Sequence, residues 1–183
     1  QPITVEPVVT QQTFVPGQPP PNLMLYFGTG RHILESDKTD TATQSFYGVW
    51  DRRQGNLARN ALARQKILFE SVRAGGKGRV TDPDLMVDYQ WKDDTHYGWY
   101  LDLPEKGERA VSDPKVIAGT VFFNTTIPED ASCGFGGEGW MMSVATHNGG
   151  SPQKRHPAFD FDGNGAIRQE GDTVIFRDRR YAY

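Results

Sequence analysis

Two short aromatic runs separated by a polar stretch constrain this chain more than any other feature. The first run is Leu23–Phe27, which ends at the triplet Gly28–Gly30, and the second is Ser45–Trp50, which ends at Asp51. Apolar runs of this length, rich in aromatic residues and bounded by Gly or Asp, are typical of buried strands. The stretch between them is rich in Asp, Thr and Ser and too short for a crossover helix. We therefore expect two antiparallel strands joined by a long polar loop.

A weak internal repeat follows the same order. Each copy has a proline-marked strand, an aromatic strand, a polar loop and a second aromatic strand. The matching segments are Val5–Val9 with Val111–Val116, Met24–Gly30 with Thr120–Thr126, and Ser45–Trp50 with Gly139–Val144. Repeated four-stranded units without crossover helices predict a β-propeller or a sandwich. A blade needs about 40 residues, so ~4 blades or part-blades fit this chain. We predict one domain, residues 1–183, with blades near 1–51, 52–104, 105–150 and 151–183.

Composition supports a turn-rich β protein and argues against nucleic-acid binding and against a membrane-spanning segment. The 183 residues are 37% hydrophobic and include 20 Gly and 12 Pro, which suits a sizeable core with many turns. A net charge of −3 offers no electrostatic footprint for nucleic acid. No run approaches the ~18 apolar residues of a membrane-spanning segment. The chain begins at Gln1 without Met and shows no signal peptide, so we expect an excised or matured piece of a longer protein.

Several motifs are shared with one known family. They are YFGTG at residues 26–30, QSFYGVWD at 44–51, GWYLDLP at 98–104 with the GER and SDP triplets after it, and a Gly-rich run from Cys133 to Trp140. Together they resemble the C-terminal propeller of the PilY-type type IV pilus biogenesis proteins, which sit at the pilus tip. The resemblance covers nearly the whole chain. It implies an all-β fold of antiparallel four-stranded blades, similar to those of quinoprotein dehydrogenases. The family propeller is larger than this chain. We therefore expect the chain to be the C-terminal portion of a larger β-propeller, and so to form only a partial propeller.

Residues 52–94 are open to two interpretations. Apolar residues recur at near-helical spacing between residues 57 and 72, which predicts one amphipathic helix. The resemblance implies instead a strand near 66–73, a hairpin at 74–78 and a strand near Arg79. We adopt the second interpretation, with a short helical turn near 56–64. A strand interrupted by Pro7 is expected at residues 3–10, where the proline implies either a sheet edge or the entry to a strand. Other strands are expected at 96–104, on both sides of a turn at Ala118-Gly119, at 140–150 and at 173–177.

The stretch AFDFDGNGAIRQEGDTV, residues 158–174, contains the sharpest candidate for a binding site. Asp160, Asp162 and Asn164 place three oxygen-bearing side chains at alternate positions, and Gly165 then permits a sharp turn. A hard cation needs several oxygens that converge from one tight turn, so this pattern predicts the first half of a calcium loop. The predicted Ca²⁺ ligands are Asp160, Asp162, Asn164, Ala166, Glu170 and Asp172.

The same stretch has a simpler interpretation. The closing carboxylate of an EF-hand loop stands at its twelfth position, which here is Gly171, so Glu170 and Asp172 each miss by one residue. Arg168 places a positive charge where a ligand or water would lie. Asp-Gly-Asn-Gly at residues 162–165 also forms a tight turn that needs no metal. The resemblance favours calcium, because PilY-type proteins carry an Asp- and Gly-rich loop of this kind near the C-terminus and bind calcium.

No catalytic constellation is visible in the sequence. The four histidines lack metal-ligand spacing, and there is no nucleophile elbow, zincin helix or Cys–His pair. Cys133 is the single cysteine, so it pairs outside this chain, is a free thiol, or is buried unpaired as a small hydrophobe. We expect the acidic loop 35–41 to be a solvated connection, with cation or partner binding as the alternative. We expect the aromatic residues to pack between blades. The chain therefore reads as a binding and assembly module, not an enzyme.

The resemblance also implies a location and partners. It implies a cell-surface protein at the pilus tip, exported through the periplasm and outer membrane, that supports pilus extension and retraction, twitching motility and adhesion under calcium regulation. The implied partners are minor pilins, the N-terminal remainder of the same protein, and a host or abiotic surface. One alternative is a quinoprotein-like propeller oxidoreductase, since Trp140–Gly150 resembles the motif that docks those blades, although the Asp expected near Ala145 is absent. The other alternative is a glycan-binding propeller.

Overall fold

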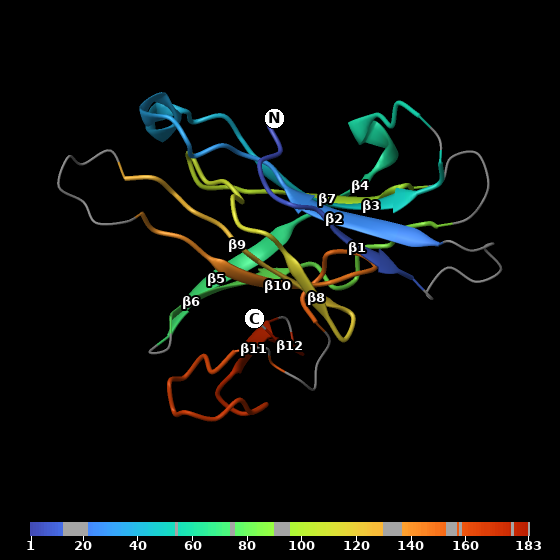
Figure 1. Ribbon diagram of the computed structural model, residues 1–183. Helices are drawn as coiled ribbons and strands as arrows, with labels where there is room; N and C mark the ends of the chain where they lie inside the picture. The colour runs from blue at the N-terminus through green and yellow to red at the C-terminus, as the bar shows by residue number, and fades with distance from the viewer. Residues whose placement is uncertain are drawn as a thin grey trace.

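The fold is almost entirely β, as the sequence predicts. The computed structural model describes residues 1–12, 22–53, 55–73, 76–89, 96–129, 137–152, 157, 159–176 and 178–182. These residues form twelve strands and two short 3-10 helices (Figure 1). Neither of these helices has the length and apolar character needed to cross a bilayer. Cys133 and the predicted hairpin tip at 74–75 lie outside the described residues.

A five-stranded sheet forms one layer. Its strands lie in the order β1 (Val8–Gln11), β2 (Leu23–Gly28), β3 (Ser45–Asp51), β7 (Gly98–Asp102) and β4 (Ala63–Gln65). The predicted antiparallel pair of aromatic strands is confirmed as β2 and β3. The predicted strand at residues 3–10 is confirmed only in its second half, because β1 begins directly after Pro7. It lies at the sheet edge, one of the two positions that the proline implies, since proline cannot donate to a ladder. β4 runs parallel to β7, and the other neighbouring strands are antiparallel.

A three-stranded sheet forms the second layer. Its strands lie in the order β10 (Met141–Ala145), β9 (Thr120–Asn124) and β8 (Lys115–Ile117). The predicted turn between β8 and β9 is confirmed, with positive φ at both Ala118 (48°) and Gly119 (79°). Two successive left-handed residues are the backbone signature of the tight turns that match the twist of antiparallel strands.

The two sheets face each other across the main core. Alternate residues of each strand point inward, so that the core contains Tyr26, Phe46, Trp99 and Leu101 from one sheet and Val121, Phe123, Met142 and Val144 from the other. Each of these side chains is at most 2% exposed. Burial of each large apolar side chain stabilises the fold by about 1.5–3 kcal/mol relative to exposure. The period-two pattern of the aromatic runs therefore decides which face of each strand is buried.

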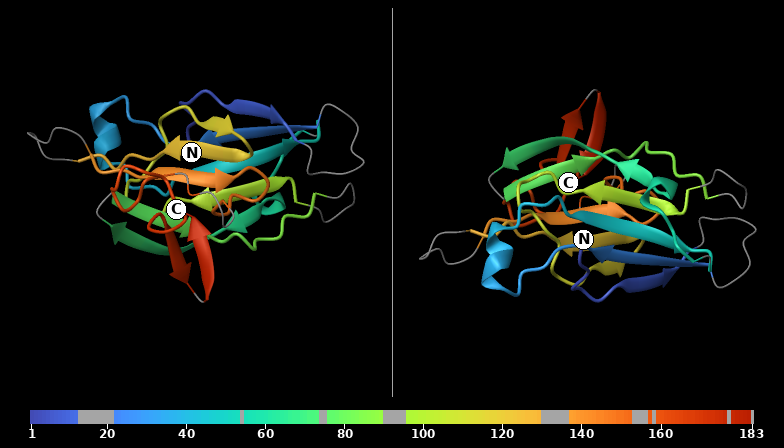
Figure 2. Two further views of the ribbon diagram at one scale, coloured as in Figure 1. Left: turned by 90° about the horizontal axis from the view of Figure 1, so that it is seen from below. Right: turned by 90° about the horizontal axis from the view of Figure 1, so that it is seen from above.

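Two hairpins complete the described fold. β5 (Ile67–Arg73) pairs with β6 (Gly76–Thr81), and β11 (Thr173–Phe176) pairs with β12 (Arg179–Ala182). The strand interpretation of residues 66–73 is thus confirmed over the helix, and η2 (Arg59–Ala61) supplies the predicted helical turn. Figure 2 shows the C-terminal hairpin projecting away from the two sheets. It is tied to β6 by a small second core of Val80, Phe161 and Tyr181.

The five-stranded sheet takes its strands from two of the predicted blade ranges. The five-stranded sheet draws β1 to β3 from residues 1–51 and β4 and β7 from residues 52–104. The described residues close no propeller. The division into four blades stays a prediction.

The acidic loop 35–41 is more ordered than its composition indicates. It contains η1 (Glu35–Thr39), and the expectation of a solvated connection is wrong for Asp37, which is only 3% exposed. The Asp37 carboxylate accepts hydrogen bonds from Arg31 Nε at 2.8 Å and from the backbone N–H of Ile33 and Leu34 at 2.9 and 2.8 Å. A short polar segment can bury a carboxylate when enough local donors replace water.

Candidate metal centre

The Asp- and Gly-rich loop is anchored at both ends. Near its start, Phe161 is 4% exposed and packs in the small core with Val80 and Tyr181. At its end, Asp172 directly precedes β11. These two anchors fix the distance that the intervening residues must span, so the loop folds back on itself.

Asp160 organises the first turn of the loop. Its Oδ1 accepts hydrogen bonds from the backbone N–H of Gly163 and Asn164 at 2.9 and 3.1 Å, and its Oδ2 accepts one from Gly165 at 2.6 Å. Gly163 and Gly165 have positive φ of 75° and 84°, which residues with a Cβ rarely adopt. The two glycines thus let the backbone wrap round the carboxylate.

Asp162 faces Asp160 from the next turn. Its Oδ1 accepts the backbone N–H of Asn164 at 3.0 Å, and its Oδ2 accepts the side-chain amide of Asn164 at 2.8 Å. Gly171 allows this approach, because a Cβ there would lie 2.0 Å from Asp162 Oδ2 and φ is +96°. Gly171, at the twelfth position of the predicted calcium loop, therefore leaves space for the carboxylate of Asp162.

Asp172 closes the loop from the other end. It is fully buried and accepts backbone hydrogen bonds from Phe161 at 2.5 Å, Asp162 at 3.2 Å and Arg168 at 2.6 Å. Burial alone raises the pKa of this carboxyl. The three N–H donors act in the opposite direction and outweigh burial, so the pKa of Asp172 lies below its ordinary value. The side chain is therefore held as a carboxylate.

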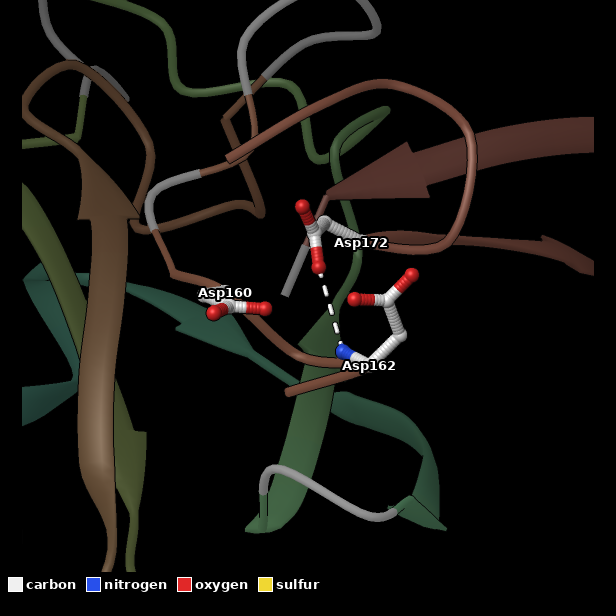
Figure 3. A group of neighbouring side chains, drawn as sticks. All are labelled: Asp160, Asp162 and Asp172. Carbon is white, nitrogen blue, oxygen red and sulfur yellow. Dashed lines mark hydrogen bonds between the residues drawn. The ribbon is translucent and has the colours of Figure 1, made fainter. Parts of the chain in front are cut away.

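The three carboxylates converge on one space. One oxygen from each of Asp160, Asp162 and Asp172 lies within 4.8 Å of the others, and Figure 3 shows the groups turned toward one another. Calcium binds oxygens at 2.3–2.6 Å, so two of its ligands lie at most about 5 Å apart. Two like charges 4 Å apart repel by roughly 4 kcal/mol at an effective dielectric constant of 20. A divalent cation would convert this repulsion into attraction, so the donor set fits a hard cation.

The other predicted ligands have different places in the loop. Asn164 directs its Oδ1 at the backbone N–H of Ala166, 2.9 Å away. Glu170 is exposed and does not belong to the group of three carboxylates among the described residues. Arg168 contributes its backbone N–H to Asp172, with an exposed side chain. Which of these residues complete a coordination sphere stays a prediction.

Comparison with known proteins finds two relatives in sequence and one in fold. No protein-family model matches it. Two proteins of Xylella fastidiosa (strain Temecula1 / ATCC 700964), each described as a "Type IV pilus biogenesis factor PilY1 homolog", are similar in sequence. One is 28% identical over 145 residues, covering 73% of this chain, and the other is 29% identical over 136 residues, covering 70%. The chain spans only 9% and 10% of the length of these relatives.

The fold is also that of a solved structure. The crystal structure of the Pseudomonas aeruginosa PilY1 C-terminal domain superposes with a TM-score of 0.74 at 22% identity, covering 100% of this chain and 38% of that chain. At this identity the likeness establishes the fold alone. The resemblance to PilY-type proteins that the sequence motifs indicate is confirmed by these comparisons.

Proposed function

We propose that this chain is the C-terminal portion of a PilY-type protein and serves type IV pilus biogenesis as a binding and assembly module. The observation that carries the proposal is the similarity to the two Xylella relatives over 73% and 70% of the chain. We propose that the whole protein acts at the cell surface and the pilus tip, after export through the periplasm and outer membrane. Its proposed partners are minor pilins and a host or abiotic surface, and its proposed roles are pilus extension and retraction, twitching motility and adhesion.

The outer face of the five-stranded sheet supports the idea of a larger propeller. Phe27, Tyr47 and Tyr100 lie in cross-strand register on β2, β3 and β7 and form an aromatic row on the face opposite the core. Phe27 and Tyr47 stack with centroids 5.3 Å apart, and Arg59 lies 4.0 Å from the centroid of the Tyr100 ring. We propose that this row packs against a further sheet of the longer protein, as the opposite face packs against β8 to β10.

Calcium is the proposed regulator of this module. The support is the convergence of Asp160, Asp162 and Asp172 within 4.8 Å, with Asp172 held as a carboxylate. When bound, Ca²⁺ would cross-link the two ends of the loop and so stiffen the segment that leads into β11. Asn164, Ala166 and Glu170 are the proposed additional ligands.

The test uses a piliated bacterium that carries the full-length gene. Deletion of the gene is expected to remove surface pili and twitching, and the intact gene is expected to restore both. A shortened gene that lacks the segment encoding residues 1–183 of this chain is expected to restore neither piliation nor twitching. Normal piliation and twitching with the shortened gene would contradict the proposal. For calcium, full-length protein with Asp162→Asn is expected to lose the response of twitching to chelator, whereas the exposed Asp178→Asn control is expected to retain it.

A further inference from the structure

A cavity lies at one end of the five-stranded sheet, where two parallel strands stop side by side. β4 ends at Gln65 and β7 ends at Asp102, which pairs with Ser45 at the start of β3. From there the chain passes from β4 to the hairpin of β5 and β6, and from β7 to β8 in the other sheet. In open sheets of parallel strands, ligands bind where neighbouring connections diverge in this way. The strand topology thus forms the cavity.

The size and lining of the cavity suit a small organic molecule. Its volume is about 480 Å³, within the usual range of 300–1,000 Å³ for small-molecule sites. Its lining includes Thr43, Arg64, Lys66, Ile67, Asp102 and Leu103. Leu101 and Pro104 also line it, so that four apolar side chains offer a surface to the hydrocarbon part of a ligand.

Lys66 has a fixed place beside the cavity. Its backbone N–H donates to Gln65 Oε1 at 2.6 Å, and its carbonyl accepts from the N–H of Asp82 at 3.0 Å. Gln65 is 2% exposed and donates to the carbonyls of Asp82 and Asn148 at 2.9 and 2.8 Å. This buried network fixes the base of the Lys66 side chain. The Lys66 ammonium itself forms no ion pair within the described part of the protein.

Asp102 does not neutralise the positive charge of the cavity. Its Oδ1 accepts hydrogen bonds from Arg59 and, at 2.7 Å, from the Ser45 hydroxyl, and its Oδ2 lies 3.2 Å from Nη2 of Arg64. Two guanidinium groups thus share this one carboxylate, and the Lys66 ammonium adds a further positive charge. Positive charge is therefore in excess where Arg64 and Lys66 line the cavity.

This combination of charge and apolar surface selects one class of ligand. A cation would meet Arg64 and Lys66, and both oxygens of Asp102 are already occupied. A neutral molecule would leave the excess positive charge without a counterion, and an inorganic anion would leave the apolar lining unused. A carboxylate on a hydrocarbon body meets both requirements, because it accepts charge-assisted hydrogen bonds and buries apolar surface.

We propose that this cavity binds an organic carboxylate. The carboxylate accepts hydrogen bonds from the Lys66 ammonium and from the N–H groups of Arg64 that do not bind Asp102, and the hydrocarbon body packs on Ile67 and Leu103. The proposal does not rest on the role in pilus biogenesis or on calcium, because none of these residues belongs to the Asp- and Gly-rich loop.

The experiment uses the 183-residue chain with benzoate and hexanoate as probes, and with benzamide and hexanamide as their neutral counterparts. Saturation-transfer NMR is expected to show transfer to the carboxylates and far less to the amides. Arg64→Gln and Lys66→Gln are each expected to weaken carboxylate binding about tenfold, through the loss of a charge-assisted hydrogen bond. Lys115→Gln is the matched control, because this exposed lysine belongs to β8 in the other sheet, and it is expected to bind as the parent does.

Several results would overturn the proposal. They are no transfer to either carboxylate, equal transfer to the amides, unchanged binding in both cavity variants, and an equal loss of binding in Lys115→Gln. Displacement of benzoate by inorganic phosphate at equal concentration would also overturn it and would identify a site for small inorganic anions. Thermal unfolding of each variant checks that the fold is retained, and the side chains of Arg64 and Lys66 are exposed, not part of the core.

Discussion

The rings of Phe46 and Phe123 stack with centroids 3.8 Å apart and planes inclined by 9°. Phe46 belongs to β3 and Phe123 to β9, so this contact joins the two sheets at the centre of the core. Both rings are at most 2% exposed. A stacked aromatic pair contributes beyond the burial of its area, by about 0.5–1.5 kcal/mol.

Loss of one ring should therefore be costly. Phe123→Ala is expected to lower the free energy of unfolding by about 3–5 kcal/mol, because it leaves a cavity between the two sheets. The sheets cannot move together enough to fill this cavity. Urea denaturation measures the change. Phe122→Ala removes the same side chain from the opposite, partly exposed face of β9 and should cost clearly less. Equal losses in the two variants would contradict the central role of the stacked pair.

Gly48 of β3 lies under the ring of Trp99. A Cβ at residue 48 would lie 2.6 Å from Cε2 of this fully buried ring. Since the ring is packed on all sides, Gly48→Ala is expected to destabilise the fold by about 1–3 kcal/mol through overpacking. Gly55→Ala is the matched control, because nothing lies within 4 Å of its added Cβ. The midpoints of thermal unfolding of the two variants are compared. Equal midpoints would contradict the prediction, because they would mean that the Trp99 ring moves to make room for the added Cβ.

The sequence predicts the local parts of this fold well. The aromatic runs that become β2 and β3 alternate between a buried and a partly exposed face, and this period is set by the strand itself. The tight turn at Ala118-Gly119 and the three converging aspartates likewise depend on neighbours in the sequence. Phe161 and Gly171 also position the Asp- and Gly-rich loop. The available signal for Phe161 was a hydrophobic residue between two aspartates.

The sequence does not reveal non-local strand pairing, nor the ordering of charged residues by contacts with nearby parts of the chain. β4 joins the sheet as a parallel neighbour of β7, although some thirty residues separate them in the chain. The charged residues Arg179 and Arg180 belong to a strand because β11 pairs with them. The burial of Asp37 depends on Arg31 and on the fold of its own loop, and composition alone indicates the opposite.

Arg109 is a buried cation that binds backbone carbonyls. Its Nη1 donates to the carbonyls of Arg31 and Asp37 at 2.6 and 2.7 Å, and its Nη2 donates to that of Asp40 at 2.7 Å. Arg109→Lys keeps the charge but cannot reproduce the planar fork. We expect a loss of about 1–3 kcal/mol and faster hydrogen exchange in loop 31–40, because carbonyls are left without donors. Unchanged exchange in that loop would mean that Arg109 does not order it.

Asp37 should make the free energy of unfolding depend on pH in the acidic range. The Arg31 side chain, joined by the N–H groups of Leu34 and Ile33, holds the pKa of Asp37 well below its ordinary value of 3.8. A carboxyl whose pKa is lower in the folded than in the unfolded chain stabilises the fold fully above about pH 4 and progressively less below it. Asp37→Asn should therefore be less stable than the parent near pH 7, and the gap should narrow toward about pH 3.

Urea denaturation across this pH range measures the gap between the Asp37→Asn variant and the parent. Asp178→Asn serves as a control, because Asp178 is exposed and asparagine tolerates its positive φ of 61°. A gap of constant size from neutral to acidic pH would show that the Asp37 carboxylate contributes through packing and not through its charge.

Calcium should stabilise the chain through Asp160, Asp162 and Asp172. A ligand that binds only the folded state adds about 2.7 kcal/mol when its free concentration is 100 times its dissociation constant. Millimolar calcium is therefore expected to raise the unfolding midpoint of the chelator-treated protein, with heat of binding seen by titration calorimetry. Asp172→Asn should abolish both effects, because it removes a buried charge from the group, whereas Asp178→Asn should retain them. The absence of both heat and a shift in the parent would contradict the proposal. The aspartates would then form a tight turn that needs no metal, and the Asp172 carboxylate would be stabilised by its three backbone N–H donors alone.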